Sequence, residues 1–321
     1  MWKPLKLASW IAIAGLAWSV GYLYNVRYGG ELSWLRAMYE RKVALASQIE
    51  APHRLLITGG SGAHYTLNAK LMEQELGIPV FNMGLDGPIG LDVILPSVLS
   101  QVRRGDIVLL IPEYLLLLDE DGLGDRSGSF GMAIGQPGLG GIPPKQFALD
   151  AMLLGVPTLR GITKSSLEVI EKGKMTGYYS DPVDERGDPT VTKERAGKWW
   201  QMTFKEPVSK HALQRISKFR EEVEAKGATL VLSLPWVYAN SNDEKTIRNV
   251  KKTAEELSKI APLIYEKDSL NLKSDSNLFA DTHYHLKPEA RTIRAMELVQ
   301  QLKPAIASQL TAPNSTTKVP Q

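Results

Sequence analysis

The chain contains no cysteine and carries almost no net charge. Without cysteine there is no thiol nucleophile, no disulfide bond and no Cys-ligated zinc site. Lys and Arg together number 38 against 35 Asp and Glu, which gives a formal charge of +3. No basic cluster is interleaved with aromatic residues, so nucleic-acid binding is not predicted. Nothing in the sequence indicates a bound cofactor, and we expect none.

Charge is also absent from one long stretch near the amino terminus. Residues 7–24, LASWIAIAGLAWSVGYLY, contain no charged side chain and follow two lysines. An apolar run of this length can cross a bilayer, and its Trp and Tyr residues suit the interfaces. The lysines favour a cytoplasmic amino terminus, although Arg27, Arg36, Arg41 and Lys42 weaken that preference. We expect residues 1–27 to be a single-pass anchor with the rest outside the cytoplasm; a cleaved signal peptide is the alternative.

The remainder alternates between short aliphatic runs and amphipathic stretches. At 321 residues and 43% hydrophobic content, the chain can bury one large core. Strands are predicted at 55–58, 80–82, 107–111, 229–234 and 264–265, with helices at 65–75, 88–102, 210–226, 243–260 and 288–310. This alternation predicts an α/β fold with a mostly parallel sheet flanked by helices on both faces.

Composition divides the chain into segments. We expect a stalk or first helix at 28–52, an α/β domain at 53–310 with an inserted lid-like segment at about 119–206, and a disordered tail at 311–321. Within the insertion, helices are predicted at 145–154 and 164–172. Asp184, Glu185 and Asp188 lack calcium-loop spacing and are interpreted as a solvated turn. Trp199 and Trp200 either stack on a sugar ring or pack within the insertion.

The first predicted strand ends in a glycine turn that presents Ser61. A serine on a tight strand-to-helix turn has an exposed hydroxyl close to backbone N–H groups, as an acyl-transfer nucleophile requires. The alternative is an ordinary turn or helix-capping serine. Trp236 and Tyr238 follow the strand at 229–234, so they are predicted to form pocket walls at the same edge of the sheet.

Near the carboxyl end, Asp281, His283 and His285 fall within five positions before a predicted helix. An early Ser and a late Asp–His pair suit a fold whose first and last loops meet at one sheet edge. The cluster can alternatively ligate a metal ion, although no further ligand cluster supports that hypothesis. His64 is predicted to lie on the surface, and His53 and His211 to be structural or exposed.

Together these motifs resemble the SGNH/GDSL hydrolase superfamily, in particular its membrane-associated bacterial branch. The resemblance covers roughly residues 53–118 and 229–305. It rests on GGS at 59–61, FNMGLDG at 81–87 and DTHYHLKPEA at 281–290. It implies a flavodoxin-like three-layer sandwich with Ser61, His285 and Asp281 as catalytic residues. The Asp281–His283 spacing is similar to that of alginate-acetylation proteins, so His283 is the second-choice base.

The resemblance implies an oxyanion hole formed by the N–H groups of Ser61 and Gly87. Two positions depart from the family pattern. The aspartate before the serine is Gly60, and the third block has Glu113 near the place of the usual asparagine. A carboxylate cannot donate to an oxyanion unless it is protonated. Asn82 or Tyr114 are the candidate substitutes, and otherwise the hole is weakened.

The resemblance therefore implies an extracytoplasmic serine esterase or O-acyltransferase anchored in the bacterial inner membrane. Its substrates would be acyl esters, above all acetyl esters, of a cell-envelope or exported glycan. A multispan membrane acyltransferase is the implied partner and acyl donor. The competing hypothesis is a non-catalytic binding or scaffold protein of the same fold in a polysaccharide modification or export system.

Overall fold

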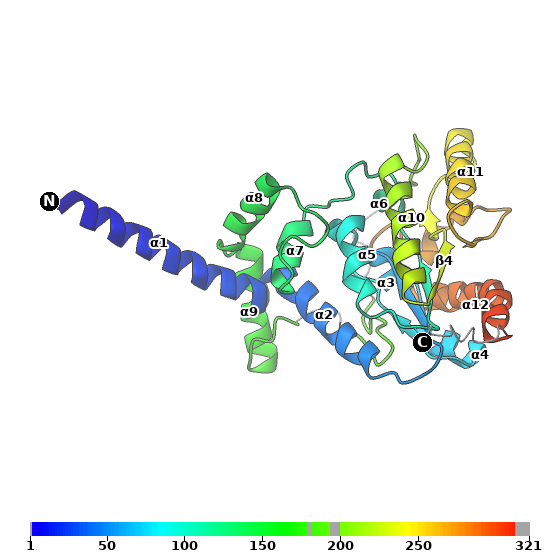
Figure 1. Cartoon of the computed structure of the whole chain (residues 1–321), viewed down its shortest axis with the longest axis horizontal. Helices are drawn as coiled ribbons and strands as arrows, with labels where there is room; N and C mark the ends of the chain where they lie inside the picture. Colours follow the sequence, from blue (N-terminus) through cyan, green and yellow to red (C-terminus); the bar gives the residue numbers. More distant parts are fainter. Residues whose placement is uncertain (1, 179–181, 193–199, 312–321) are drawn as a thin grey trace, which may run out of the picture.

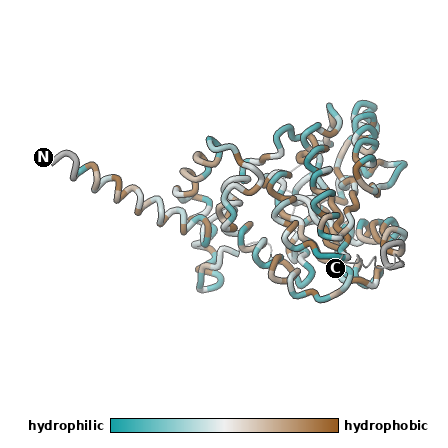
Figure 2. Tube along the Cα trace, in the orientation of Figure 1, coloured by the Kyte–Doolittle hydropathy of each residue, from teal (hydrophilic) through white to brown (hydrophobic). Residues whose placement is uncertain are grey.

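The computed structural model describes residues 2–178, 182–192 and 200–311. A long helix, α1 (Trp2–Arg27), projects from the rest of the chain (Figure 1). Within it, Lys6–Arg27 reaches a mean hydropathy of 1.4 and is long and apolar enough to span a membrane. Its window is only 6% buried by protein, and apolar residues recur along it in Figure 2.

The described strands form a five-stranded parallel sheet in the order β2-β1-β3-β4-β6. The strands are β1 (Leu55–Thr58), β2 (Val80–Asn82), β3 (Ile107–Leu110), β4 (Thr229–Ser233) and β6 (Leu263–Ile264). The predicted α/β class with a mostly parallel sheet is confirmed. Two further strands, β5 (Val237–Tyr238) and β7 (Leu272–Lys273), pair separately beside it.

Successive strand residues enter opposite layers of the core, because side chains alternate across a sheet. Leu55 and Ile57 pack with α4 (Ala69–Leu76) and α12 (Pro288–Thr311), whereas Leu56 packs in the other layer. That layer includes α2 (Gly30–Ser47), α5 (Leu91–Leu99), α10 (Lys210–Ala225) and α11 (Glu244–Ser258). Burial on both faces explains why these strands are continuous aliphatic runs.

Helix boundaries near the glycine turns differ from the prediction. The segment 65–75 was expected to be one helix, but a short turn, α3 (Ser61–His64), comes first and α4 begins at Ala69. The side chain of Asn68 caps α4 by accepting from the N–H of Leu71. Before α5, the 3-10 turn η1 (Gly87–Ile89) replaces the predicted helical start. Gly90 ends η1 with a φ of 82°, which precludes a continuous helix.

The segment between β3 and β4 contains α6 (Tyr114–Leu117), α7 (Ser127–Ala133), α8 (Pro144–Leu154) and α9 (Leu159–Lys172). Figure 1 places α8 and α9 where α1 meets the rest of the chain, away from the sheet. The prediction of a solvated turn is wrong for Asp188, which is buried and accepts from Asn82 and from the N–H of Ala69. Trp199 and all but the first residue of the predicted tail lie outside the described residues.

Candidate active site

Three turns meet at the carboxyl edge of the sheet, where the strand order reverses on either side of β1. The turn after β1 carries Ser61, the loop after β2 carries Gly87, and the residues after β3 include Glu113. Ligands of open α/β sheets bind at such a switch point, because the loops of neighbouring strands diverge there and leave a crevice. The sheet order therefore brings together residues that are 52 positions apart in the chain.

Glu113 fills the space beneath the Ser61 turn. Its carboxylate accepts hydrogen bonds from the N–H of Gly62 at 2.6 Å and from the N–H of Gly60 at 2.9 Å. The hydroxyl of Ser61 donates to Oε1 of the same carboxylate at 3.4 Å. Glu113 is completely buried, whereas Ser61 is half-buried. The carboxylate thus holds the turn from below and engages the candidate nucleophile.

The Glu113 side chain occupies the space that side chains at positions 60 and 62 would need. A Cβ atom at Gly60 would lie 2.5 Å from Oε1 of Glu113, and one at Gly62 would lie 2.6 Å from its Cγ. Any side chain at either position would displace the glutamate. The segment after β3 therefore supplies a carboxylate to the Ser61 turn, and glycine at positions 60 and 62 makes room for it.

The carboxyl group of Glu113 is poised to hold a proton near neutral pH. Burial raises its pKa to about 7, although the N–H groups of Gly62 and Gly60 act in the opposite direction. The nearby Asp86 adds to the upward shift. Asp86 itself has a raised pKa through burial, partly offset by its ion pair with Arg126. A protonated Glu113 can donate a hydrogen bond, which the ionised form cannot do.

The two backbone donors predicted for an oxyanion lie beside this carboxyl group. Within the described part of the chain, the N–H groups of Ser61 and Gly87 have no hydrogen-bond acceptor. A Cβ at Gly87 would lie 3.6 Å from Oε1 of Glu113 and 3.2 Å from the methyl groups of Leu115. Leu115 is 45% exposed, so an apolar side chain borders the same turn. Sequence reasoning did not single out Leu115, because an aliphatic run after a strand ordinarily indicates core.

Asn82 and Tyr114 are not placed to donate to an oxyanion. The amide nitrogen of Asn82 donates to the carbonyls of Ala63 and His64 and to Asp188, while its oxygen accepts from the N–H of Gly84. These contacts hold the first two turns together. The ring of Tyr114 packs on Phe204 in the core, 4.1 Å between centroids, and its burial raises the pKa of the hydroxyl.

The side chains of Asp281 and His285 are in direct contact, as a candidate acid–histidine pair. Nδ1 of His285 lies 2.7 Å from Oδ1 of Asp281, and the N–H of His285 donates to Oγ1 of Thr282. Nε2 of His285 is buried and has no hydrogen-bond partner among the described residues. With the Asp281 contact at Nδ1, Nε2 is the lone-pair nitrogen of the neutral ring and can accept a proton. The Ser61 hydroxyl bonds to Glu113 rather than to this nitrogen.

Tyr65 connects the two ends of the site. Its ring lies 4.2 Å from the ring of His285, and its carbonyl accepts from the N–H of Leu286. The N–H of Tyr65 donates to the carbonyl of Ser61, so the same residue closes the nucleophile turn. Tyr65 therefore sets the position of the imidazole relative to Ser61. Its sequence context indicated only a helix residue, since stacking across the fold leaves no local signal.

His283 has a different environment from His285. Its Nε2 lies 2.8 Å from the carbonyl of Trp200, and its ring faces Tyr238 at 6.3 Å. Trp200 is 72% exposed. Trp236 is buried with Phe279, Leu286 and Ala290 in a small cluster, and Nζ of Lys273 lies 4.2 Å above its ring. Tyr238 thus lies at the surface beside His283, and Trp236 supports the loop from inside.

A buried basic pair lies behind the second turn. Nζ of Lys42 donates to the carbonyl of Gly84 at 2.6 Å and lies 2.9 Å from Nδ1 of His64. Both side chains are fully buried, so the prediction that His64 lies on the surface is wrong. His64 was expected on the surface of the helix that follows Ser61, but α3 turns inward and packs it against Tyr65. His53 bonds to the carbonyl of Gly105 and His211 to Asp92, both as structural contacts.

Among the described residues, no group of three His, Asp or Glu side chains is arranged to hold a metal ion. Asp281 and His285 face each other, and His283 faces Trp200.

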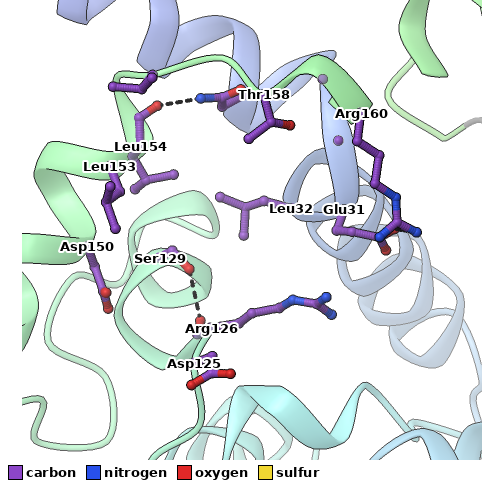
Figure 3. A pocket seen from close by; sticks show the side chains of 14 residues that line it. Glu31, Leu32, Asp125, Arg126, Ser129, Asp150, Leu153, Leu154, Thr158 and Arg160 are labelled. Carbon is purple, nitrogen blue, oxygen red and sulfur yellow. Dashed lines mark hydrogen bonds and ion pairs between the residues drawn. The ribbon is translucent and has the colours of Figure 1, made fainter. Parts of the chain in front are cut away.

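A cavity of about 390 Å³ lies apart from Ser61 and His285, beside the carboxyl end of α1 (Figure 3). Its lining includes Leu32, Leu153 and Leu154 together with the ion pair of Glu31 and Arg160. Arg126 also lines it and pairs with Asp86, next to Gly87. One ion pair thus links the cavity to the second turn of the candidate active site.

Comparison of the sequence with family models and with curated proteins gives no match. Among solved structures, the chain is similar to a protein of Streptococcus pneumonia described as a platelet activating factor. That likeness has 11% identity and a TM-score of 0.39, over 86% of this chain and 94% of the other. A Bacillus subtilis protein matches with 14% identity and a TM-score of 0.34, over 79% of this chain and 57% of the other. Both likenesses are low.

Proposed function

We propose that the chain is a membrane-anchored serine esterase or O-acyltransferase that acts on acyl esters outside the cytoplasm. One observation carries the proposal: the Asp281–His285 pair presents a buried Nε2, with no hydrogen-bond partner in the described part of the chain, next to the turn that carries Ser61. A proton acceptor held in one tautomer beside a hydroxyl on a strand-to-helix turn supplies the parts of a serine nucleophile.

In the proposed reaction, the hydroxyl of Ser61 attacks the ester carbonyl and passes its proton to Nε2 of His285. Asp281 fixes the tautomer through Nδ1 and stabilises the imidazolium that forms. Because Ser61 bonds to Glu113 in the free protein, its side chain must rotate about the Cα–Cβ bond before transfer. Hydrogen bonds of catalytic groups commonly align only when substrate is bound.

The negative charge that develops on the carbonyl oxygen is received by the N–H groups of Ser61 and Gly87. Protonated Glu113 is the third donor in this proposal, in the place of an asparagine amide. Its Oε1 lies near Ser61 and Gly87. Burial raises the pKa of Glu113 to about 7, which favours the neutral form below that pH. Each such donor contributes on the order of 3 kcal/mol to transition-state stabilisation.

The acceptor decides between the two activities. Transfer of the acyl group to water gives an esterase, and transfer to a sugar hydroxyl gives an O-acyltransferase. The substrate class, acetyl esters of an exported or cell-envelope glycan, is proposed from the family resemblance alone. The same resemblance is the basis for proposing the bacterial inner membrane, the extracytoplasmic side and a multispan acyltransferase as acyl donor. The apolar length of α1 supports single-pass anchoring.

A non-catalytic scaffold of the same fold is the second candidate. The observation in its favour is the hydrogen bond from Ser61 to Glu113, which occupies the hydroxyl in the free protein. A scaffold would keep that contact permanently, whereas an enzyme must release Ser61 when the substrate ester enters the site.

The deciding experiment is active-site labelling of the full chain in detergent with a fluorophosphonate probe. We expect labelling of the wild type, and its loss in Ser61→Ala and in His285→Ala. Ser269→Ala is the matched control, because Ser269 lies on a surface loop, where its hydroxyl bonds to Glu266 and to the N–H of Asn271. Labelling that survives Ser61→Ala, or a wild type that never labels at any pH between 6 and 9, would favour the scaffold.

A further inference from the structure

Exposed apolar side chains are concentrated in two places, α1 and the α8–α9 hairpin (residues 144–175). On the hairpin, Met152 is 68%, Leu153 69%, Leu159 80% and Ile170 78% exposed. Large exposed apolar residues are few elsewhere in the described part of the chain. Isolated exposed apolar residues are ordinary, but this many on one short segment favour a surface that is covered in use.

The hairpin is fastened to α1 by specific contacts. The indole N–H of Trp18 lies 3.0 Å from the carbonyl of Ala151 and 3.2 Å from that of Met152. The side-chain amide of Asn25 donates to the carbonyl of Leu154 at 2.8 Å. Figure 1 shows α8 and α9 beside the carboxyl-terminal part of α1, between the projecting helix and the sheet. The hairpin is therefore at a fixed level along α1.

If α1 spans a bilayer, the part of α1 at Trp18, where the hairpin is attached, lies inside that bilayer. Trp18 precedes Arg27, the end of the apolar stretch, by nine residues. At about 1.5 Å per residue this is about 14 Å along the helix. The outer half of a hydrocarbon core measures about 15 Å. With Arg27 at the interface, the backbone around Met152 lies within that half, while α9 begins near Gly30 at the level of the lipid headgroups.

We propose that the α8–α9 hairpin is a second membrane-binding element: the exposed apolar side chains near Met152 insert among lipid acyl chains of the outer leaflet, and those at the start of α9 lie at the boundary between headgroups and acyl chains. This inference rests on the proposed anchoring by α1. Lipid is the favoured occupant because the hairpin is attached to α1 at a level that lipid surrounds. Five basic and three acidic residues lie between 144 and 175, a balance that suits an interfacial hairpin.

Two attachments restrict the sheet domain more than a single helix does. The cavity of Figure 3 lies between α1, α2 and the hairpin, and Arg126 also lines it. Arg126 forms an ion pair with Asp86, which directly precedes Gly87 of the second turn. The hairpin thus holds the candidate active site at a set distance from the bilayer, instead of leaving it on a flexible tether.

The absence of cysteine allows a direct test on the full chain. Single cysteines replace Met152 and Leu159 on the hairpin, Ile11 on α1, and Glu244 on α11, and each carries an environment-sensitive NBD label. The proteins are reconstituted in phosphatidylcholine–phosphatidylglycerol vesicles with and without doxyl-labelled acyl chains. We expect blue-shifted emission at positions 11, 152 and 159, with a loss of about half the intensity at 11 and 152 and a smaller loss, about a quarter, at 159, which lies nearer the headgroups. The label at 244 should lose less than about a tenth of its intensity, because its side chain is exposed on the sheet domain.

The outcomes separate this inference from the anchor. Quenching at position 11 with none at 152 and 159 would overturn the hairpin proposal and leave α1 as an anchor. No quenching at position 11 would remove the anchor and the hairpin proposal together, while leaving the serine chemistry to be tested by labelling. A partner protein that covers the hairpin in cells would leave both hairpin labels in water in these vesicles, and that result would also overturn the proposal.

Discussion

The sheet domain and the α8–α9 hairpin use apolar residues in opposite ways. In the sheet domain, strand residues such as Leu109 are completely buried between two helical layers. On the hairpin, Met152, Leu159 and Ile170 remain mostly exposed although the segment is equally helical and well connected to α1. Apolar composition alone does not distinguish the two regions.

The difference lies in what surrounds each region. The parallel sheet supplies two faces for covering helices, so its apolar side chains find protein partners. The hairpin packs on α1, α2 and α7, and many of its apolar side chains nevertheless remain exposed. Polar groups are buried in both regions. Behind the candidate active site, the bonds of Lys42, His64, Asp188 and Glu113 fix its turns, and on the hairpin Glu168 is buried. We therefore expect substitutions in the sheet domain to affect chemistry and stability, and those on the hairpin to affect lipid contact.

The largest expected effect distinguishes the two histidines of the last loop. His285→Ala should lower ester turnover or probe labelling about a thousandfold, because it removes the proton acceptor held by Asp281. His283→Ala is the matched variant and should retain most of the signal, since His283 contacts Trp200 at the surface. Steady-state hydrolysis of a chromogenic acetyl ester provides the measurement. A loss confined to His283→Ala would reassign the base.

A core truncation should have the next largest effect. Leu109→Ala removes a fully buried side chain from the central strand β3, and we expect the free energy of unfolding to fall by about 3 kcal/mol. Urea unfolding followed by circular dichroism measures this change. A loss below about 1 kcal/mol would mean that the sheet core is loosely packed, and would remove the contrast with the hairpin.

The third effect concerns pH. Burial raises the pKa of Glu113 to about 7, so the neutral, hydrogen-donating form is lost as pH rises through 7. Wild-type turnover should then fall by up to about tenfold per pH unit above 7. Glu113→Gln should abolish this alkaline decline at a lower absolute rate, since the amide is always neutral but cannot accept from both glycine N–H groups.

Asp188→Asn is the control for this prediction, because burial also raises the pKa of Asp188 to about 7. It should preserve the alkaline decline. The same titrations affect folding: a buried acid whose pKa is raised stabilises the fold below its unfolded pKa, and this contribution is lost as pH rises to about 7. A decline that survives in Glu113→Gln and disappears in Asp188→Asn would contradict the role assigned to Glu113.

The smallest expected effect is on the hairpin. Leu159→Ala should change the free energy of unfolding of the detergent-solubilised chain by less than about 0.5 kcal/mol, because the side chain is 80% exposed. The test compares the free energies of unfolding of Leu159→Ala and Leu109→Ala, measured under identical conditions. A cost near that of the core variant would show that protein, rather than lipid, covers this residue.

Local pattern was sufficient for the sheet and for part of the site. Runs such as 107–111 are aliphatic at every position, and this pattern is typical of a strand whose two faces are both buried under helices. Ser61 and the Asp281–His285 pair were identified because a glycine turn after a strand and an acid–histidine pair before a helix are short local signals. The start of α4 was misplaced, because capping by Asn68 depends on where α3 ends.

The sequence by itself determined the parallel α/β class, the apolar helix at the amino terminus and the candidate nucleophile and base. These depend on periodicity and on neighbours in the chain. Only the tertiary structure decided that Glu113 fills the space left by Gly60 and Gly62, that Lys42 and His64 are buried together, and that the hairpin lies at the level of Trp18. The physical reason is that burial and close approach arise between residues 22 to 134 positions apart, where the packing of whole elements sets the distance.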